Sequence, residues 1–229
     1  ANCSIGRFVS IEGDVELGEG CKVGDRSVLR GPLRVGCSTE FQEMTMVGGH
    51  SPHLGAARNG PIEIGHHCTF EVGSIVLAPH GLDGKEGVTR IGNNVFVHMR
   101  GEVSHDCTVE DDSAIAGELC GFCHIMRGAK LMKGTIAHQH STIGSSAFLA
   151  MGVQSTHDLL PFCVHDGNQA VLDRIALSRA GLSLEESDEL QAFYEQNFGR
   201  GRALTAEAIA GDMPSREGLD RLFTSDGLT

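Results

Sequence analysis

A histidine followed directly by an aspartate, His105-Asp106, is the feature of the sequence best suited to chemistry. A histidine near neutral pKa accepts a proton from an attacking hydroxyl or amine, and a carboxylate orients the ring and stabilises its cationic form. Gly117 lies a short way downstream, and the N–H of a glycine can stabilise the oxyanion of an acyl-transfer intermediate. His-Asp pairs are also common on protein surfaces, so by spacing alone an ordinary solvated pair is the alternative.

The scaffold that would position this pair is a six-residue repeat. One apolar residue recurs at every sixth position, at Ile5, Ile11, Leu17, Val23, Leu29, Val35, Phe41 and Val47. Neither a helix nor a flat strand selects every sixth residue. A hexad does, because each unit makes one short strand and a turn with its apolar residue inward, and three units close a triangular coil. The repeat predicts an all-β fold, a left-handed parallel β-helix whose hand follows from the repeat type.

The repeat also restricts where His105 can lie. Val103 is one of the inward residues, and strict alternation along a strand would turn His105 inward as well. A base that serves a substrate needs access, so we expect His105 at a turn. Prisms of this repeat class commonly form trimers, which would place that turn in a groove between subunits.

Three stretches interrupt the repeat. Residues 49–61 and 80–89 read as loop excursions from the prism, and long loops in repeat arrays usually serve binding surfaces. The register slips between Ile115 and Ile125, which we interpret as about four extra residues that bulge out near 118–124. Cys120 and Cys123 lie in that segment, and their lone CxxC spacing favours a neutral loop over a metal or redox site.

The pattern becomes helical after Gly167-Asn168, which divides the chain into a β-helix over 1–168 and a helical region over 169–229. Helical spacing joins Val171, Leu172, Ile175 and Arg179 and ends at Gly181, a typical C′ glycine. Ser183-Leu-Glu-Glu186 reads as a capping box, followed by an apolar face of Leu190, Phe193 and Tyr194. Thr205 and Ser215 are expected to cap two further short helices.

Composition narrows the partners and the compartment. The formal net charge of −12 argues against nucleic acid and anionic membranes. No apolar run approaches the roughly 20 residues of a membrane span, and the N-terminus lacks a secretory signal. Eight scattered cysteines fit reduced thiols packed as small apolar residues. We therefore expect a cytoplasmic protein without a membrane span.

The stretch Ser104-His-Asp-Cys-Thr-Val-Glu-Asp111 resembles the catalytic stretch of the UDP-N-acetylglucosamine O-acyltransferases, hexapeptide-repeat enzymes of lipid A biosynthesis. The resemblance runs from about Leu17 to about Phe198. Its further matching points are Glu63-Ile-Gly65, Ala116-Gly117, His138-Gln139, Ile143-Gly144 and Gly167-Asn168.

The resemblance implies a trimeric acyltransferase that needs no metal or other cofactor. His105 would be the general base, Asp106 would orient it, and the Gly117 N–H would hold the oxyanion. The acyl group would come from acyl carrier protein or CoA and pass to a hydroxyl or amine of a sugar-nucleotide-like or amine-bearing acceptor. The implied substrate-binding positions are Gln42, Glu43, His138, Gln139, Asn168 and, for the carrier, Arg179.

Three positions depart from the family pattern. Glu102 and Glu118 stand where the family has histidines, three residues before the base and directly after the oxyanion glycine. Two carboxylates disfavour an anionic acceptor and favour one that bears an amine. Met151 stands where long-chain members have a glycine that floors the acyl channel, so we expect a short or medium acyl group.

Two other functions stay open from the residues. A zinc enzyme of the γ-carbonic anhydrase type shares the prism and uses three histidines at subunit interfaces, and the sequence has twelve histidines. A non-catalytic binding scaffold descended from the enzyme would explain the two glutamate replacements.

Overall fold

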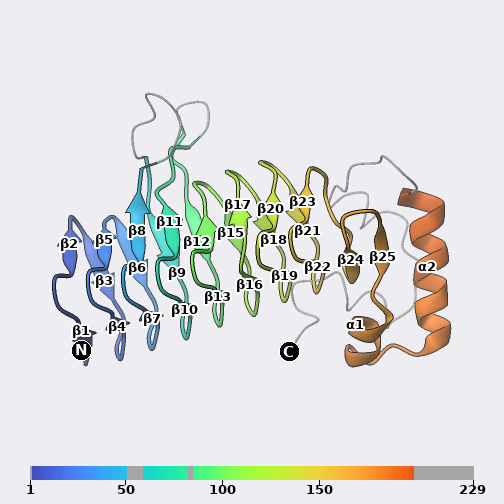
Figure 1. Cartoon of the computed structure of the whole chain (residues 1–229), viewed down its shortest axis with the longest axis horizontal. Coiled ribbons are helices and arrows are strands. Elements are labelled where there is room, and N and C mark those ends of the chain that lie inside the picture. Colours follow the sequence, from blue (N-terminus) through green and yellow to red (C-terminus); the bar gives the residue numbers. More distant parts are fainter. Residues whose placement is uncertain (1, 51–58, 82–84, 199–229) are drawn as a thin grey trace.

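The computed structural model describes residues 2–50, 59–81 and 85–198, which form a three-sided prism of stacked coils (Figure 1). Each coil places one short strand in each of three parallel sheets. The first sheet contains, in spatial order, β1 (Ser4–Ile5), β4 (Lys22–Val23), β7 (Glu40–Phe41), β10 (Thr69–Phe70), β13 (Phe96–Val97), β16 (Ala114–Ile115), β19 (Lys130–Leu131), β22 (Phe148–Leu149), β24 (Cys163–His165) and β25 (Ala170–Leu172).

The other two sheets follow the same order of coils. The second contains β2 (Ser10–Glu12), β5 (Val28–Arg30), β8 (Met46–Gly49), β11 (Ile75–Leu77), β14 (Glu102–Val103), β17 (Glu118–Leu119), β20 (Ile136–Ala137) and β23 (Gln154–Ser155). The third contains β3 (Val15–Leu17), β6 (Leu33–Val35), β9 (Ile62–Ile64), β12 (Thr89–Ile91), β15 (Thr108–Val109), β18 (His124–Ile125) and β21 (Thr142–Ile143).

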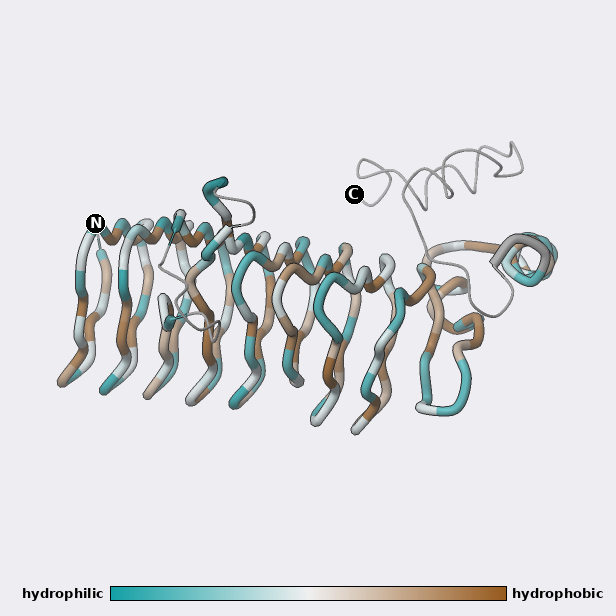
Figure 2. The backbone as a smooth tube through the Cα atoms, turned by 90° about the horizontal axis from the view of Figure 1, so that it is seen from above, coloured by the Kyte–Doolittle hydropathy of each residue, from teal (hydrophilic) through white to brown (hydrophobic). Residues whose placement is uncertain are grey.

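The apolar residue of each hexad points into the prism, as the repeat predicts. Val47, Phe70, Val103 and Leu149 are fully buried there, and hydrophobic and hydrophilic residues alternate along the coils (Figure 2). The first coil is the exception, because Ile5 and Ile11 have no coil before them and stay 46% exposed. Burial of one aliphatic side chain in every hexad supplies most of the stabilising apolar area.

The two predicted excursions leave the prism at the same edge, between β8 and β9 and between β11 and β12 (Figure 1). Their described ends contact each other: the Asn59 side-chain amide donates to the Lys85 carbonyl at 3.0 Å, and the Gly87 N–H donates to the Asn59 carbonyl at 2.9 Å. The base of the second excursion is therefore held against that of the first.

The predicted bulge at 118–124 is wrong. Residues 118–119 form strand β17, and Leu119 is buried in the prism at 1% exposure. Phe96 pairs with Ala114, 18 residues on, but Glu102 pairs with Glu118, only 16 residues on. The corner between β16 and β17 is thus two residues short, and an inward residue follows Ile115 after four positions instead of six.

The C-terminal end of the prism is covered by α1 (Arg174–Arg179) and α2 (Leu184–Phe198) (Figure 1). The predicted capping box is confirmed, because the Ser183 N–H donates to the Glu186 carboxylate and the Glu186 N–H to the Ser183 hydroxyl. Leu190 is fully buried, and the Tyr194 hydroxyl donates to the Pro161 carbonyl at 3.3 Å.

One part of the helical prediction is wrong. Val171 and Leu172 belong to β25, which turns back antiparallel onto β24, and the helix begins only after Asp173 caps it through its carboxylate. Pairing with an open sheet edge wins over local helical spacing here. Gly181, with φ of +89°, follows the helix as predicted. The expected caps Thr205 and Ser215 lie outside the described residues, in which no helix is long and apolar enough to cross a membrane.

The short coil makes Leu119 a core residue, so we predict that Leu119→Ala lowers the free energy of unfolding by about 2–5 kcal/mol, the usual result of a buried leucine truncation. The matched control is Leu184→Ala, a leucine that is 77% exposed, for which a change within about 0.5 kcal/mol is expected. Chemical denaturation measures both. Equal effects in the two variants would mean that residue 119 lies in a surface bulge.

Candidate active site

The turns that join the second sheet to the third carry most of the chemistry. They comprise residues 104–107, 120–123 and 138–141 on consecutive coils, together with both excursions, and we call them the His105 edge. His105 lies in the turn after β14, as predicted, and Asp106 follows at φ of +58°. Hydrogen bonds between coils stack the turns: the Phe122 N–H donates to the His105 carbonyl and the His140 N–H to the Gly121 carbonyl, each at 3.1 Å.

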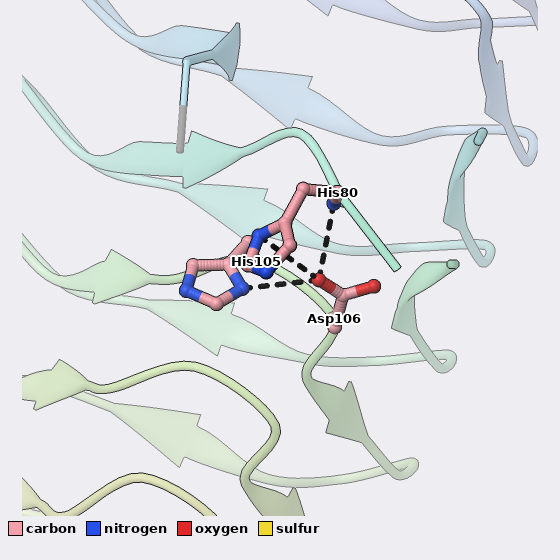
Figure 3. Close-up of side chains that lie close together, drawn as sticks. All are labelled: His80, His105 and Asp106. Carbon is pink, nitrogen blue, oxygen red and sulfur yellow. Dashed lines mark hydrogen bonds and ion pairs between the residues drawn. The ribbon is translucent and has the colours of Figure 1, made fainter. Parts of the chain in front are cut away.

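The predicted pair of His105 and Asp106 is in contact. The His105 Nδ1 lies 3.0 Å from Asp106 Oδ2 (Figure 3). Their side chains are only 3% and 5% exposed within the single chain. If Nδ1 holds the proton and donates it to the carboxylate, Nε2 is the unprotonated nitrogen and can accept one.

The second excursion fixes the position of the Asp106 carboxylate. The N–H groups of His80 and Gly81 donate to it at 3.1 Å each, and the Asp106 N–H donates to the Thr89 hydroxyl at 2.9 Å. Hydrogen bonds of this kind are what allow a carboxylate to remain charged away from water. The loop that the sequence predicts as an excursion therefore supports the catalytic pair directly.

His80 is a site residue that the sequence reasoning missed. Its Nδ1 lies 3.6 Å from Asp106 Oδ2, and its ring centroid lies 4.2 Å from that of His105 (Figure 3). Both imidazoles thus approach the same carboxylate oxygen. The only signal in the sequence was a histidine at the first position of the second excursion.

The glycine beside His105 is Gly121 and not Gly117. A Cβ built on Gly121 would lie 2.2 Å from His105 Cε1 and 2.4 Å from Nε2, whereas one on Gly117 would meet Thr135. Gly117 pairs at the level of Gly101, because the Glu102 N–H donates to the Gly117 carbonyl. The short coil is the reason: it brings Gly121 beneath His105, so the Ala-Gly likeness at 116–117 points to the wrong turn.

An aromatic wall closes one side of the site. The Phe122 ring stands edge-on to His105, with centroids 5.2 Å apart, and to His80, at 5.6 Å. Its own face stacks on the exposed ring of His140, with centroids 4.8 Å apart and an angle of 6°. Phe122, and not Glu118, is the residue that directly follows the glycine beside His105.

Glu102 and Glu118 lie side by side on the outer face of the second sheet, where they are direct partners in the β14–β17 register. Burial first and the Glu118 charge second raise the pKa of the Glu102 carboxyl above its ordinary value. Cys120 follows on the same strand, and burial together with the charges of Cys123 and both glutamates raises the pKa of its thiol. Neither Cys120 nor Cys123 forms a disulfide.

The remaining predicted residues fall in three places. His138 and Gln139 are exposed on the His105 edge. Gln42, Glu43 and Met151 lie on the opposite border of the second sheet, in the turns that join it to the first sheet, and Met151 is 74% exposed. We call that border the Met151 edge. Asn168 lies in the β24–β25 turn and Arg179 at the end of α1, and both are exposed.

The cluster formed by His80, His105 and Asp106 is, within the described residues, the group of three or more ligand-type side chains close enough to share a metal ion. All three come from the second-to-third-sheet turns of two neighbouring coils. The arrangement provides a base, an orienting carboxylate and a second imidazole in one place.

Comparison with known proteins identifies relatives over most of the chain. The chain is 25% identical over 214 residues to a curated acyl-[acyl-carrier-protein]–UDP-N-acetylglucosamine O-acyltransferase of Campylobacter concisus, an alignment covering 90% of this chain and 80% of the relative. It is 29% identical over 189 residues to the enzyme of that name from Gloeothece citriformis, covering 77% and 67%. No protein-family model matches the chain.

Solved structures give the same result for the fold. The UDP-N-acetylglucosamine acyltransferase of Francisella novicida superimposes with a TM-score of 0.77 at 19% identity, covering 91% of this chain and 80% of that one. The Arabidopsis enzyme superimposes with a TM-score of 0.69 at 22% identity, covering 89% and 82%. The predicted left-handed parallel β-helix is thereby confirmed. Sequence and fold together confirm the predicted resemblance as well, and the chain is an acyltransferase related to the UDP-N-acetylglucosamine O-acyltransferases.

Proposed function

We propose that the chain transfers an acyl group from a carrier thioester to a hydroxyl or amine of a sugar-nucleotide-like acceptor, with His105 as general base. The observation that carries this proposal is the 3.0 Å contact between His105 Nδ1 and Asp106 Oδ2 at a turn of the prism. The curated relatives, whose names specify an acyl carrier protein donor and UDP-N-acetylglucosamine, support the reaction class.

The geometry supports a proton shuttle through His105. The acceptor gives its proton to Nε2 while its oxygen or nitrogen attacks the thioester carbon, and the Asp106 carboxylate stabilises the resulting imidazolium. The new C–O or C–N bond forms and the C–S bond breaks. The departing thiolate takes the proton back from His105, so the base is restored in each turnover.

We assign the oxyanion donor to Gly121 in place of Gly117. Gly121 touches the imidazole edge that bears Nε2, and among the described residues nothing accepts a hydrogen bond from its N–H. A free N–H next to the base lies where the thioester oxygen would gain negative charge. The absence of a Cβ at this position leaves space for both the ring and the carbonyl group.

A second copy of the chain would complete the site. The base and the oxyanion donor lie on the His105 edge, but Gln42, Glu43 and Met151 lie on the Met151 edge, across the width of the second sheet. Residues on two edges of one prism cannot converge on one substrate. In a homotrimer with three-fold symmetry, the His105 edge of one subunit can face the Met151 edge of the next.

The acceptor that fits this surface best bears an amine. The Glu102 and Glu118 pair stands on the outer face beside the His105 edge, and the raised pKa of Glu102 shows that a second negative charge there is already unfavourable. A cationic group relieves this repulsion, and an added phosphate increases it. Acyl carrier protein and CoA are both suitable donors, and Arg179, exposed at the end of α1, is the proposed contact for a carrier.

We predict that His105→Ala lowers kcat/KM for acyl transfer by about 10²- to 10⁴-fold, because the general base is lost. His124→Ala is the matched control, since His124 also pairs with a carboxylate, Glu110, at 2.7 Å on the outer face but lies away from the turn. Steady-state assays with acyl-carrier-protein and acyl-CoA donors measure both variants. A non-catalytic scaffold would show no activity that depends on His105.

The glutamate pair predicts a pH-dependent stability. Because the folded chain raises the pKa of Glu102, it holds this proton at pH values where the unfolded chain has lost it, so stability falls as pH rises through that window. Removal of the neighbouring charge in Glu118→Gln is therefore expected to raise the free energy of unfolding more at about pH 7.5 than at about pH 4. Glu19→Gln, at an exposed site, is the control. Equal gains at both pH values would contradict the coupling.

The acyl chain is expected to be limited by Met151. We predict that Met151→Gly shifts the preferred acyl chain to greater length, with each added methylene changing discrimination by about 1–3 kcal/mol. The measurement is the ratio of kcat/KM values for donors that differ in chain length. Met99→Gly, an exposed methionine on the same edge, should leave that ratio unchanged. An unaltered ratio in Met151→Gly would remove the residue from the acyl channel.

A further inference from the structure

We propose that His80, His105 and Asp106 form a binding site for a divalent zinc-class metal ion, and that the bound ion inhibits the enzyme. The ligands would be Nδ1 of each imidazole and Oδ2 of Asp106. Two imidazoles and one carboxylate form a donor set that zinc uses in proteins, with the fourth position open to water.

The spacing of the donor atoms fits such an ion. Zinc binds imidazole nitrogen and carboxylate oxygen at about 2.0–2.2 Å, so two donors of a tetrahedral site lie about 3.3–3.5 Å apart. The Oδ2 of Asp106 is 3.0 Å from the His105 Nδ1 and 3.6 Å from the His80 Nδ1, which brackets that value. The three donors all lie within 4.8 Å of one another (Figure 3).

The cluster is also held in place before any ion binds. The Asp106 carboxylate accepts hydrogen bonds from the N–H groups of His80 and Gly81 at 3.1 Å each. Phe122 packs edge-on against both imidazoles. Outer contacts of this kind orient metal ligands and strengthen binding, and the His80 side chain, at 17% exposure, is the most open of the three.

Binding of the ion would remove the catalytic pair from use. The ion takes the Nδ1 lone pair of His105 and the Asp106 oxygen that orients the ring, so the imidazole can no longer exchange contact with Asp106 for a proton at Nε2. This inhibitory consequence rests on the proposed function, whereas the metal site itself does not. His80, which the proposed reaction leaves without a step, supplies the second imidazole.

The test is titration of the metal-free full chain with zinc by calorimetry and with cobalt by visible absorption, which reports tetrahedral coordination by nitrogen and oxygen. We expect one ion per chain in the wild type, and loss of that binding in both His80→Asn and His105→Gln. The control is His124→Asn, which alters another histidine–carboxylate pair and should bind as the wild type does. Thermal melting verifies that each variant is folded.

Zinc should also inhibit acyl transfer by the wild type and by His124→Asn over the concentration range in which it binds. Absence of a tetrahedral cobalt spectrum, or binding that survives in a folded His80→Asn, would overturn the proposed site. Binding without inhibition would overturn the inhibitory role. Loss of activity in His105→Ala without added metal tests the proposed reaction separately, so the two proposals can fail independently.

Discussion

Hydrogen bonding between successive coils decides which residues of this chain meet. In a parallel β-helix each residue lies over its equivalent one coil away, and the N–H and C=O groups of both must pair. The number of residues in a coil therefore sets the contacts of every turn that follows. Here one coil has 16 residues between paired positions where its neighbours have 18. That difference moves Gly121 beneath His105 and makes Leu119 part of the core.

The excursion over residues 78–88 supplies the second constraint on the site. A carboxylate at 5% exposure, such as that of Asp106, would be strongly destabilising without hydrogen-bond donors. Two backbone N–H groups of the excursion and the His105 ring provide them. The same excursion places His80 against the pair. Support of the catalytic residues and assembly of a possible metal site are thus two results of one loop.

Most of the fold could be predicted from the sequence, because the hexad repeat is periodic and each apolar position faces the same interior. His105 and Asp106 could be found as neighbours in the chain, and their placement at a turn followed from the inward direction of Val103. Gly121 and His80 could not be found in this way. Their positions depend on how many residues one corner omits and on where a loop returns, and neither is encoded in local spacing.

The central claim is that the turn at Gly121, and not the one at Gly117, lies at the reacting atoms. The most direct measurement compares kcat/KM and melting temperature in Gly121→Ala and Gly117→Ala. The first adds a Cβ against the His105 ring and the second adds one against the Thr135 carbonyl. Gly121→Ala should lower kcat/KM by about 10²-fold, as expected when a base or an oxyanion donor is displaced, while Gly117→Ala should mainly lower the melting temperature. Wild-type kcat/KM in a folded Gly121→Ala would contradict this account.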